Sequence, residues 1–438
     1  MGKFHDDVRK ILYQNQEEVD RRILNGIERY RKGTCKLSFV NEAGMPIKHV
    51  KLWGGLKTHL FNFGANLFML DELETDTKNA LYKQHFQQLF NMATLPFYWR
   101  DLEPEEGKPR YSKDSPRIYR RPAPDLCLQW CKETGIRPKM HCLNYDVWSP
   151  DWLERHNRTI IKEKIEKHFQ ELAQRYANDI YPWEVTNETL LLDHCTDFYF
   201  DDDYVEWSFQ TAEKYFADNE LIINEAMWHA WELYAANRTP YYMLIDRLLR
   251  SGHRIDAIGM QYHMFWPRES AMEHLRIAYD LKQFYDIMDL YGRFQRPLQI
   301  TEITIPAYST DPEDEALQAE ILTRLYKLWF SHPLMEAIIY WNLVDGYAAF
   351  AEPGSEDGEN YYHGGLLRYD LTPKPAYWAL EQLICQEWHT SLDTEFESEY
   401  TFRGFYGEYD IMVEAKGVIR NISFELKPDQ ENVITITL

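Results

Sequence analysis

The segment YPWEVTNE, residues 181–188, has the features of a buried strand that ends in reactive side chains. It is apolar and β-prone through Trp183 and Val185, and it closes on Asn187 and Glu188. Burying an unpaired carboxylate is costly, so a strand that delivers one to its end indicates a functional position. The surrounding sequence predicts which sheet this strand belongs to and whether Glu188 has a partner.

Seven other apolar segments resemble this one, and amphipathic stretches such as 159–177 and 315–331 lie between them. Strands that alternate with helices predict a parallel sheet. Eight such units fit a (β/α)8 TIM barrel with long loops. The alternative is a doubly wound sheet, which usually carries a glycine-rich phosphate loop that this sequence lacks. The seven segments are 61–67, 93–99, 137–145, 220–226, 255–263, 297–304 and 337–344.

The two ends of the chain have sequence patterns that differ from that of the predicted barrel. The N-terminal end is helix-periodic over residues 5–32, and residues 34–53 then alternate on both sides of a turn, which predicts a β-hairpin. The C-terminal end reads as several alternating strands. Neither set closes a core alone, so we predict that both ends form one small accessory β-sandwich beside the barrel. The predicted divisions are an N-terminal helix (1–33), the hairpin (34–60), the barrel (61–390) and the C-terminal strands (395–438).

Composition excludes several classes of partner. The net charge is −22, from 48 basic and 70 acidic residues, which argues against nucleic acid and anionic membranes as partners. No CxxC motif occurs and no His, Asp or Glu cluster has ligand spacing, so we expect no metal and no cofactor. No signal peptide or long apolar run is visible. We expect a cytoplasmic protein if the chain is complete, and a secreted or periplasmic one if a leader was removed.

Other predicted strands also end in side chains capable of catalysis. The sixth ends in Gln261 and His263, the seventh ends in Glu302, and the eighth contains Trp341. Active sites of such barrels lie at these strand ends, so Glu302 is the candidate partner of Glu188. Two carboxylates across a cleft suit glycoside hydrolysis, in which one is ionised and the other donates a proton. The alternative is two unrelated buried glutamates in ion pairs.

Several motifs, taken together, resemble glycoside hydrolase family 10, a family of retaining endo-β-1,4-xylanases. The resemblance covers about residues 60–385, implies the same barrel, and follows the order of the strands. The motifs are FNFGANL (61–67), WRDLEPEEGKPRY (99–111), SPDWL (149–153), WEVTNE (183–188), IGMQYH (258–263), ITEIT (300–304), YWNLVDGY (340–347) and GLLRYDLTPKPAYWAL (365–380).

The resemblance implies roles for the matched residues. Glu188 would be the general acid/base and Glu302 the nucleophile. Asn187 would bind the 2-hydroxyl of the sugar being cleaved, and His263 would hold Glu302 ionised together with Gln261. Trp341 would form the floor under that sugar. The expected substrate-binding residues are Gln261, Trp341, Asp146, Tyr98, Trp152, Tyr347 and Arg100.

Positions whose side chains bind the sugar in this family carry different residues in this sequence. In LPFYWR (95–100), Tyr98 replaces a lysine and Arg100 replaces a glutamate of the family pattern NxMKWE. Asp146 falls on the second histidine of HTLVWHSQ, and Ala349 falls on a tryptophan of the eighth-strand motif. Loss of hydrogen-bond partners for specific sugar hydroxyls changes substrate specificity by large factors. We therefore expect a substrate class no narrower than β-linked plant-type glycans, such as xylan or a related oligosaccharide.

Two alternatives to an endo-acting hydrolase stay open from the sequence. One keeps the mechanism in an exo-acting or transglycosylating enzyme on small β-glycosides. The other is a glycan-binding protein without turnover, although the presence of both glutamates and His263 speaks against it. The acidic loop 351–365 is expected either to shape one end of the cleft or to form a solvated face.

Overall fold

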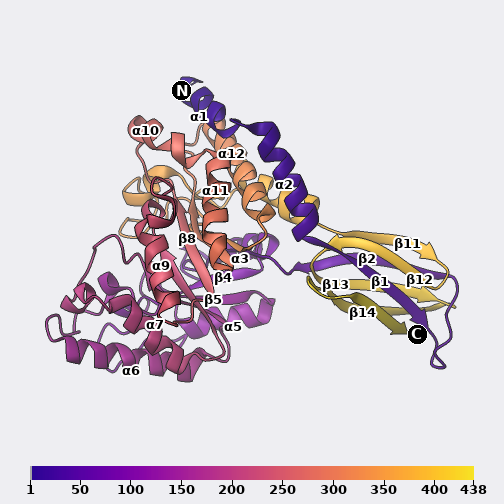
Figure 1. Ribbon diagram of the computed structural model, residues 1–438, viewed down its shortest axis with the longest axis horizontal. Coiled ribbons are helices and arrows are strands. Elements are labelled where there is room, and N and C mark those ends of the chain that lie inside the picture. The colour runs from indigo at the N-terminus through magenta and orange to yellow at the C-terminus, as the bar shows by residue number, and fades with distance from the viewer. Residues whose placement is uncertain (1) are drawn as a thin grey trace.

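The computed structural model describes residues 2–438, which form a closed barrel and a smaller β-module (Figure 1). Eight parallel strands close the barrel in the order β10-β3-β4-β5-β6-β7-β8-β9. Each overlaps one of the eight segments predicted as strands, so the (β/α)8 prediction is confirmed. The barrel strands are β3 (Asn62–Asn66), β4 (Met92–Pro96), β5 (Arg137–His141), β6 (Pro182–Asn187), β7 (Glu220–Glu225), β8 (Ala257–His263), β9 (Leu298–Thr304) and β10 (Met335–Tyr340).

Helices surround the barrel, and local sequence signals determine where several of them begin. The Thr75 hydroxyl accepts a hydrogen bond from the Lys78 amide at 3.2 Å at the start of α3. Asp311 caps α12 in the same way, with Pro312 as the first helical residue. The barrel helices are α3 (Asp76–Leu89), α4 (Trp99–Leu102), α5 (Pro124–Thr134), α6 (Arg158–Tyr176), α7 (Tyr204–Tyr215), α8 (Met227–Ala230), α9 (Pro240–Arg250), α10 (Arg268–Ala278), α11 (Leu281–Tyr291), α12 (Pro312–Ser331) and α13 (Pro375–Glu381).

The barrel strands are buried on both faces. Every residue of β6 and of β9 is buried, as expected for parallel strands covered by helices outside and packed together inside. Because both strands are rigid parts of the core, the side chains at their C-terminal ends have fixed positions. Glu302 belongs to β9, and Glu188 follows the last residue of β6.

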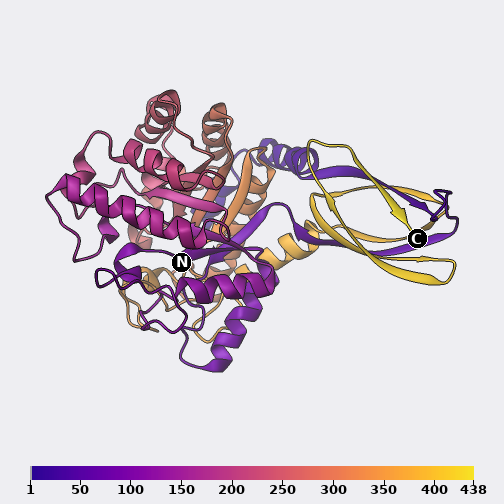
Figure 2. The same ribbon diagram turned by 90° about the horizontal axis from the view of Figure 1, so that it is seen from below.

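The β-module is a sandwich of two sheets built from both ends of the chain, as predicted. One sheet has the order β12-β1-β15, and the other has the order β11-β2-β13-β14. It projects from one side of the barrel in both views (Figures 1 and 2). Its strands are β1 (Lys32–Val40), β2 (Val50–His59), β11 (Ser391–Phe396), β12 (Glu399–Phe405), β13 (Gly407–Ala415), β14 (Val418–Leu426) and β15 (Asn432–Thr437).

The predicted N-terminal hairpin takes a different form, because β1 and β2 lie in opposite sheets. β1 pairs with β12 and β15, whereas β2 pairs with β11 and β13. Between them only an isolated bridge joins Val40 to Pro46. The C-terminal strands therefore supply the long partners that each N-terminal strand needs, which ties the two ends of the chain together.

The region before β1 contains two helices where one was expected. They are α1 (Gly2–Leu12) and α2 (Gln16–Tyr30), separated at Asn15, whose φ of 59° is left-handed. α2 packs closely on α12 at Gly26, where an added Cβ atom would lie 2.3 Å from the Ser331 carbonyl oxygen. Across residues 2–438, no helix combines the length and apolar character needed to cross a bilayer.

Candidate active site

A cavity of about 450 Å³ opens at the C-terminal end of the barrel. It collects residues from the ends of most barrel strands and from the loops that follow them. The cavity therefore lies where function is expected in this fold. Its lining includes Phe68, Tyr98, Arg120, Arg121, His141, Tyr145, Trp148, Asn187, Glu188, Met227, Trp228, Gln261, His263, Phe265, Glu302, Trp341, Phe350 and Glu359.

The two glutamates predicted to work together lie side by side in this cavity. The Gln261 side-chain nitrogen donates to Oε1 of Glu188 at 2.8 Å and to Oε1 of Glu302 at 3.0 Å. These two carboxylate oxygens are therefore separated by at most the sum of those distances, about 5.8 Å. Because Gln261 lies on β8, a rigid strand fixes the spacing of the two carboxylates.

Glu188 has an unusual backbone conformation and a second hydrogen-bond donor. Its φ is 52°, a left-handed value that is uncommon for residues other than glycine and that clusters at functional sites. The Tyr145 hydroxyl donates a hydrogen bond to its Oε2 atom. With Gln261 on Oε1, both oxygens of Glu188 are held by hydrogen bonds, one from the loop after β5 and one from β8.

Glu302 is buried and accepts hydrogen bonds on both of its oxygens. His263 Nε2 lies 3.1 Å from Oε2, and the Asn224 side-chain nitrogen donates to Oε1 at 3.3 Å. Burial raises the pKa of Glu302, and the charge of Glu188 raises it further, whereas His141 lowers it. Burial also lowers the pKa of His263 to about 4. A neutral His263 then donates through Nε2 while its Nδ1 faces the Thr304 hydroxyl at 3.0 Å.

Asn187 lies beside the carboxylate pair, as predicted. Its Oδ1 atom accepts hydrogen bonds from Asn224 at 2.8 Å and from Gln261 at 3.2 Å. Both contacts use the oxygen, so the side-chain nitrogen is the atom left to donate to a ligand hydroxyl.

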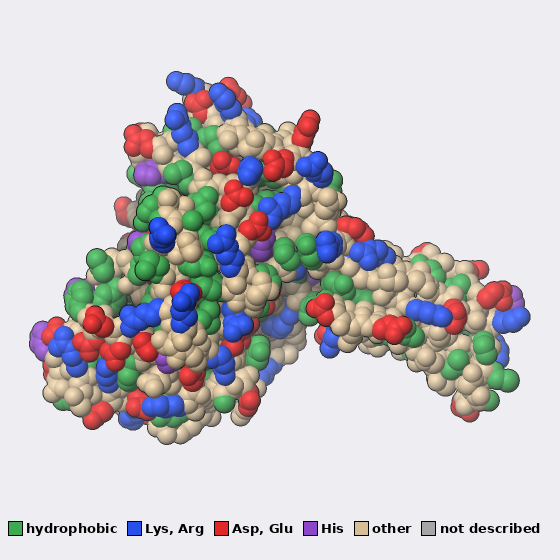
Figure 3. All heavy atoms as spheres, viewed as in Figure 1, with side chains coloured by type: hydrophobic (Ala, Val, Ile, Leu, Met, Phe, Trp, Pro, Cys, Tyr) green, Lys and Arg blue, Asp and Glu red, His purple; other side chains and the backbone are tan. Residues whose placement is uncertain are grey.

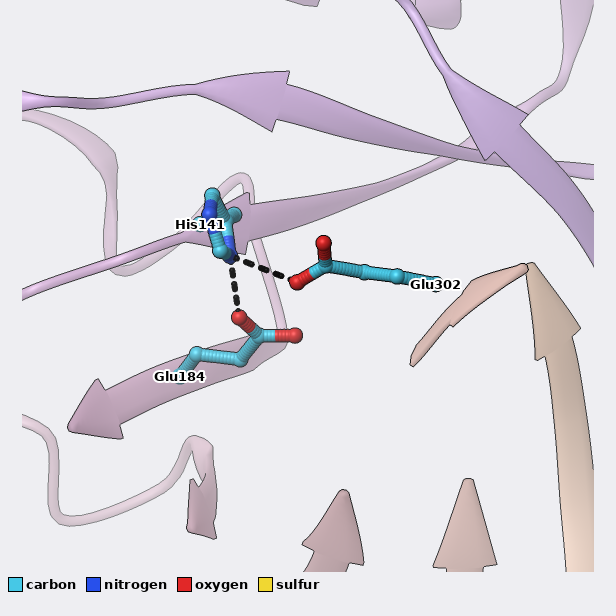
Figure 4. Close-up of side chains that lie close together, drawn as sticks. All are labelled: His141, Glu184 and Glu302. Atoms are coloured by element: carbon cyan, nitrogen blue, oxygen red, sulfur yellow. Dashed lines mark hydrogen bonds and ion pairs between the residues drawn. The ribbon is translucent and has the colours of Figure 1, made fainter. Parts of the chain in front are cut away.

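Beneath the pair, a buried ionic network surrounds His141. The His141 Nδ1 atom hydrogen-bonds Glu184 and lies 4.0 Å from Oε1 of Glu302, so the three side chains point toward one another (Figure 4). Burial opposes ionisation of Glu184, but Lys139 and His141 lower its pKa to about 2. Burial likewise disfavours the His141 cation, yet Glu184 and Glu302 raise the pKa of His141 overall.

The same three side chains are close enough to be tested as a metal site. Their donor atoms lie within 4.8 Å of one another. However, the Lys139 ammonium, which is fully buried, already forms an ion pair with Glu184. A metal ion would have to compete with that ammonium, so the residues fit a network of charged hydrogen bonds better than a metal centre.

Aromatic side chains form part of the cavity wall. Trp341, which the sequence predicted, packs edge-on against Phe68 at 5.2 Å, and Tyr98 packs against Phe68 at 5.9 Å. The Tyr98 hydroxyl also lies 3.1 Å from Nε2 of His141. The guanidinium of Arg121 stacks 4.1 Å from the centre of the Tyr98 ring. Tyr98 therefore lines the cavity as expected, although it contacts histidine and arginine side chains.

Four of the expected substrate-binding residues lie outside the cavity lining. Asp146 is buried and accepts hydrogen bonds from the Thr196 amide at 2.9 Å and hydroxyl at 2.6 Å, so it holds a loop. Trp152 donates to a backbone carbonyl at 2.7 Å, and Tyr347 bonds a glutamate at 2.7 Å. Arg100 stacks on an indole at 4.0 Å. None of the four residues lines the cavity, although the indole on which Arg100 stacks, Trp148, does.

The structure brings into the site residues that the sequence did not single out. His141 and Tyr145 contact Glu302 and Glu188, and Asn224 bonds Asn187. A signal for the first two was present, since both belong to HCLNYD (141–146), which includes the C-terminal half of the third predicted strand. Asn224 carried no comparable signal, because it reads as one more residue of an apolar strand.

A family model matches the part of the chain that contains the site. The model described as glycosyl hydrolase family 10 matches residues 57–383. Among solved structures, xylanase 10B from Thermotoga petrophila RKU-1 in complex with xylobiose superposes with a TM-score of 0.60 at 19% identity, covering 75% of this chain and 94% of that one. At this identity the likeness shows the barrel fold alone.

The alignment with this chain covers different shares of the curated relatives. The anti-sigma-I factor RsgI6 of Acetivibrio thermocellus is 23% identical over 404 residues, which are 89% of this chain and 46% of that protein. Endo-1,4-beta-xylanase C of Paenibacillus barcinonensis is 23% identical over 71% of this chain and 30% of its own. A beta-1,4-xylanase of Dictyoglomus thermophilum is 22% identical over 79% of this chain and 95% of its own. The chain thus spans less than half the length of the first two.

Proposed function

The chain belongs to glycosyl hydrolase family 10, and from this premise we propose that it is a retaining β-glycoside hydrolase of the xylanase type. Glu188 is the general acid/base and Glu302 is the nucleophile. The substrate is a β-linked oligo- or polysaccharide such as xylan.

The spacing of the two glutamates is the observation that carries the proposal. In retaining enzymes the carboxyl groups stand roughly 5–5.5 Å apart, whereas inverting enzymes separate them by roughly 6.5–9.5 Å to admit a water molecule. The shared contact with Gln261 limits the two Oε1 atoms to about 5.8 Å. At least one pair of carboxylate oxygens is therefore closer than the separation of an inverting pair, which supports direct attack by a carboxylate on the sugar.

The hydrogen bonds around each glutamate support the division of roles. Glu302 faces three potential donors, from Gln261, Asn224 and His263, and hydrogen bonds to a carboxylate favour its ionised form. An ionised Glu302 attacks the anomeric carbon as Glu188 gives its proton to the departing glycosidic oxygen. A glycosyl ester on Glu302 results, and the bond to the leaving group breaks.

In the second step Glu188 acts as a base. It takes a proton from water, the water oxygen attacks the anomeric carbon, and the ester to Glu302 breaks. Asn187 supports the reaction by directing its free side-chain nitrogen toward the 2-hydroxyl, a contact that strengthens in the transition state. Trp341 offers an apolar ring beside the same sugar.

The substrate panel is the experiment that tests the function. Wild type and Glu302→Gln are given xylo-, gluco-, manno- and galacto-oligosaccharides, decorated xylan and aryl β-glycosides. We expect wild type to hydrolyse the xylan-type substrates and the variant to lose at least about 10⁴-fold in kcat, since the covalent route is removed. The matched control is Glu336→Gln, which changes a partly buried glutamate at the opposite end of the barrel.

The panel also distinguishes the two alternatives. Hydrolysis restricted to small aryl glycosides, with release of single sugars or transfer products, would favour an exo-acting or transglycosylating enzyme. No hydrolysis of any substrate by folded protein, combined with sugar-dependent thermal shifts, would favour a glycan-binding protein. Equal activity of wild type and Glu302→Gln would refute the nucleophile assignment.

A further inference from the structure

A second cavity of about 560 Å³ lies next to the catalytic one. It is formed by α8 and the segment that follows it, together with α10 and α11. In the space-filling view, hydrophobic side chains gather beside α10 and α11 (Figure 3). Its lining is mostly aromatic and apolar, and includes Met227, Trp228, Trp231, Leu233, Tyr234, Trp266, Ile277 and Phe284.

The second cavity adjoins the catalytic cavity. Met227 and Trp228 line both of them. These residues follow the end of β7, and the Glu188 amide donates to the Asn224 carbonyl of that strand at 3.3 Å. The shared wall therefore lies on the side of Glu188. In a glycosidase, the group beside the acid/base is the leaving group.

The arrangement of the walls suits a flat aromatic ligand. The Trp228 and Trp266 rings lie 4.9 Å apart at 87°, which makes a corner. A planar aromatic group in such a corner stacks on one ring and meets the other edge-on, the two geometries that aromatic pairs prefer. Trp228 is 50% exposed and Tyr234 is 79% exposed. Large exposed rings grouped at a cavity mark a binding surface.

The charges around the cavity further restrict the class of ligand that it can bind. Its polar lining residues include Glu232 and Glu273. His274, the basic side chain in the lining, stacks on Trp266 at 4.8 Å. A ligand that carries a carboxylate would meet two like charges and no arginine or lysine. The cavity therefore favours an uncharged aromatic group over a free phenolic acid.

We propose that this cavity binds the aromatic aglycone of the substrate, so that the enzyme prefers β-glycosides whose leaving group carries a neutral aromatic ring. This preference rests on the proposed function, because it places the ring on the leaving-group side of Glu188. Trp228 lines both the catalytic and the aromatic cavity, and Tyr234 is an exposed ring in the lining of the aromatic cavity.

Binding to the inactive Glu302→Gln protein separates this preference from catalysis. Calorimetry compares the methyl and 2-naphthylmethyl β-glycosides of the disaccharide accepted in the substrate panel, with xylobiose as first choice. We expect about tenfold tighter binding of the naphthylmethyl glycoside. Adding Trp228→Ala or Tyr234→Ala should reduce this ratio to about twofold or less. The matched control is Trp378→Ala, which removes a tryptophan that is 53% exposed on α13 and should keep the tenfold ratio.

A second measurement needs no sugar. Free 2-naphthylmethanol should change the tryptophan fluorescence saturably in wild type and in Trp378→Ala, and not in Trp228→Ala. Equal affinity for the two glycosides, in a protein that hydrolyses the disaccharide series, would overturn the aromatic site and leave the hydrolase intact. Saturable naphthylmethanol binding without hydrolysis of any glycoside would instead support the aromatic site and refute the proposed hydrolase reaction.

Discussion

The Tyr145 hydroxyl donates a hydrogen bond to Oε2 of Glu188. The other oxygen of Glu188 accepts from Gln261 at 2.8 Å, so the carboxylate is fixed from two sides. Tyr145 comes from the segment after β5, and Gln261 lies on β8. The loop after β5 and the strand β8, which is separated from β6 by β7, thus orient the proposed acid/base.

Replacing Tyr145 with phenylalanine should weaken acid catalysis. Loss of a hydrogen bond to a carboxylate predicts a fall in kcat/KM of about tenfold or more on oligosaccharides, whose leaving groups need a proton. On dinitrophenyl glycosides, whose leaving groups need none, we expect a change of about twofold or less. Steady-state kinetics on both series measures the difference, with Tyr181→Phe, at the opposite end of the barrel, as control. Equal losses on both series would show that Tyr145 acts on folding or binding alone.

Glu188→Ala should be rescued by azide on an activated aryl glycoside. Without the acid/base, the glycosyl ester on Glu302 accumulates, and a small anion enters the vacated space and attacks it. The product expected by NMR is a β-glycosyl azide, formed at a rate that rises with azide concentration. Glu302→Ala serves as the counterpart, because there the azide takes the nucleophile's place and the product is an α-azide. An α-azide from Glu188→Ala would refute the assignment of Glu188 as the acid/base.

The acid limb of the pH profile should depend on His141. The proposed nucleophile works when ionised, so we expect activity to be lost as pH falls through the pKa of Glu302. Burial raises that pKa and His141 lowers it. His141→Gln should therefore move the acid limb of kcat/KM to higher pH, while the exposed control His156→Gln should leave it in place. A shift to lower pH would mean that His141 does not act on Glu302 through its charge.

The sequence predicted the parts of the site that local pattern encodes. Glu188 and Glu302 each end an apolar strand, and a strand's buried pattern and its last residue are visible without knowing what surrounds it. Asp146 was placed in the site by its position in a motif, but the structure uses its carboxylate to hold Thr196. Tyr145, one residue earlier, faces Glu188. Both residues lie beyond β5, which ends at His141, and Asp146 begins a short 3-10 helix, so the alternation of a strand does not tell which of the two faces the site.

Long-range pairing was less visible in the sequence. The alternation of residues 34–53 is compatible with a hairpin, and nothing local states that β1 prefers β12 and β15 as neighbours. Those partners lie more than 350 residues away along the chain. The buried network of Lys139, His141 and Glu184 also depends on contacts between different strands. It emerges when the barrel closes.

Glu302→Gln should stabilise the protein, and more so at alkaline pH. Burial raises the pKa of Glu302 in the folded state, so the native protein holds the proton more tightly than the unfolded chain does. Stability from this group is present below the unfolded pKa and is lost as pH rises through the folded pKa. Removing the charge should raise Tm by about 1–3 °C more at pH 8 than at pH 5. Calorimetry measures this, with the exposed Glu395→Gln as control. The same gain at both pH values would contradict a raised pKa.

Deleting residues 395–438 should destabilise the whole protein. The deletion removes both neighbours of β1, so Leu37 and Phe39, which are fully buried, lose the strands that complete their sheet. The module also contacts the barrel, because Phe405 packs against Phe330 at 6.1 Å. We expect Tm to fall by roughly 5 °C or more, measured by calorimetry at fixed pH.

A shorter deletion shows whether that loss comes from the shared sheet. Removing residues 430–438 takes away β15 and leaves β12 paired with β1, so the fall in Tm should be smaller than for the longer deletion. If β1 is stabilised by both neighbours, the two deletions rank in this order. An unchanged Tm in the longer deletion would mean that the N-terminal strands hold the barrel without their C-terminal partners.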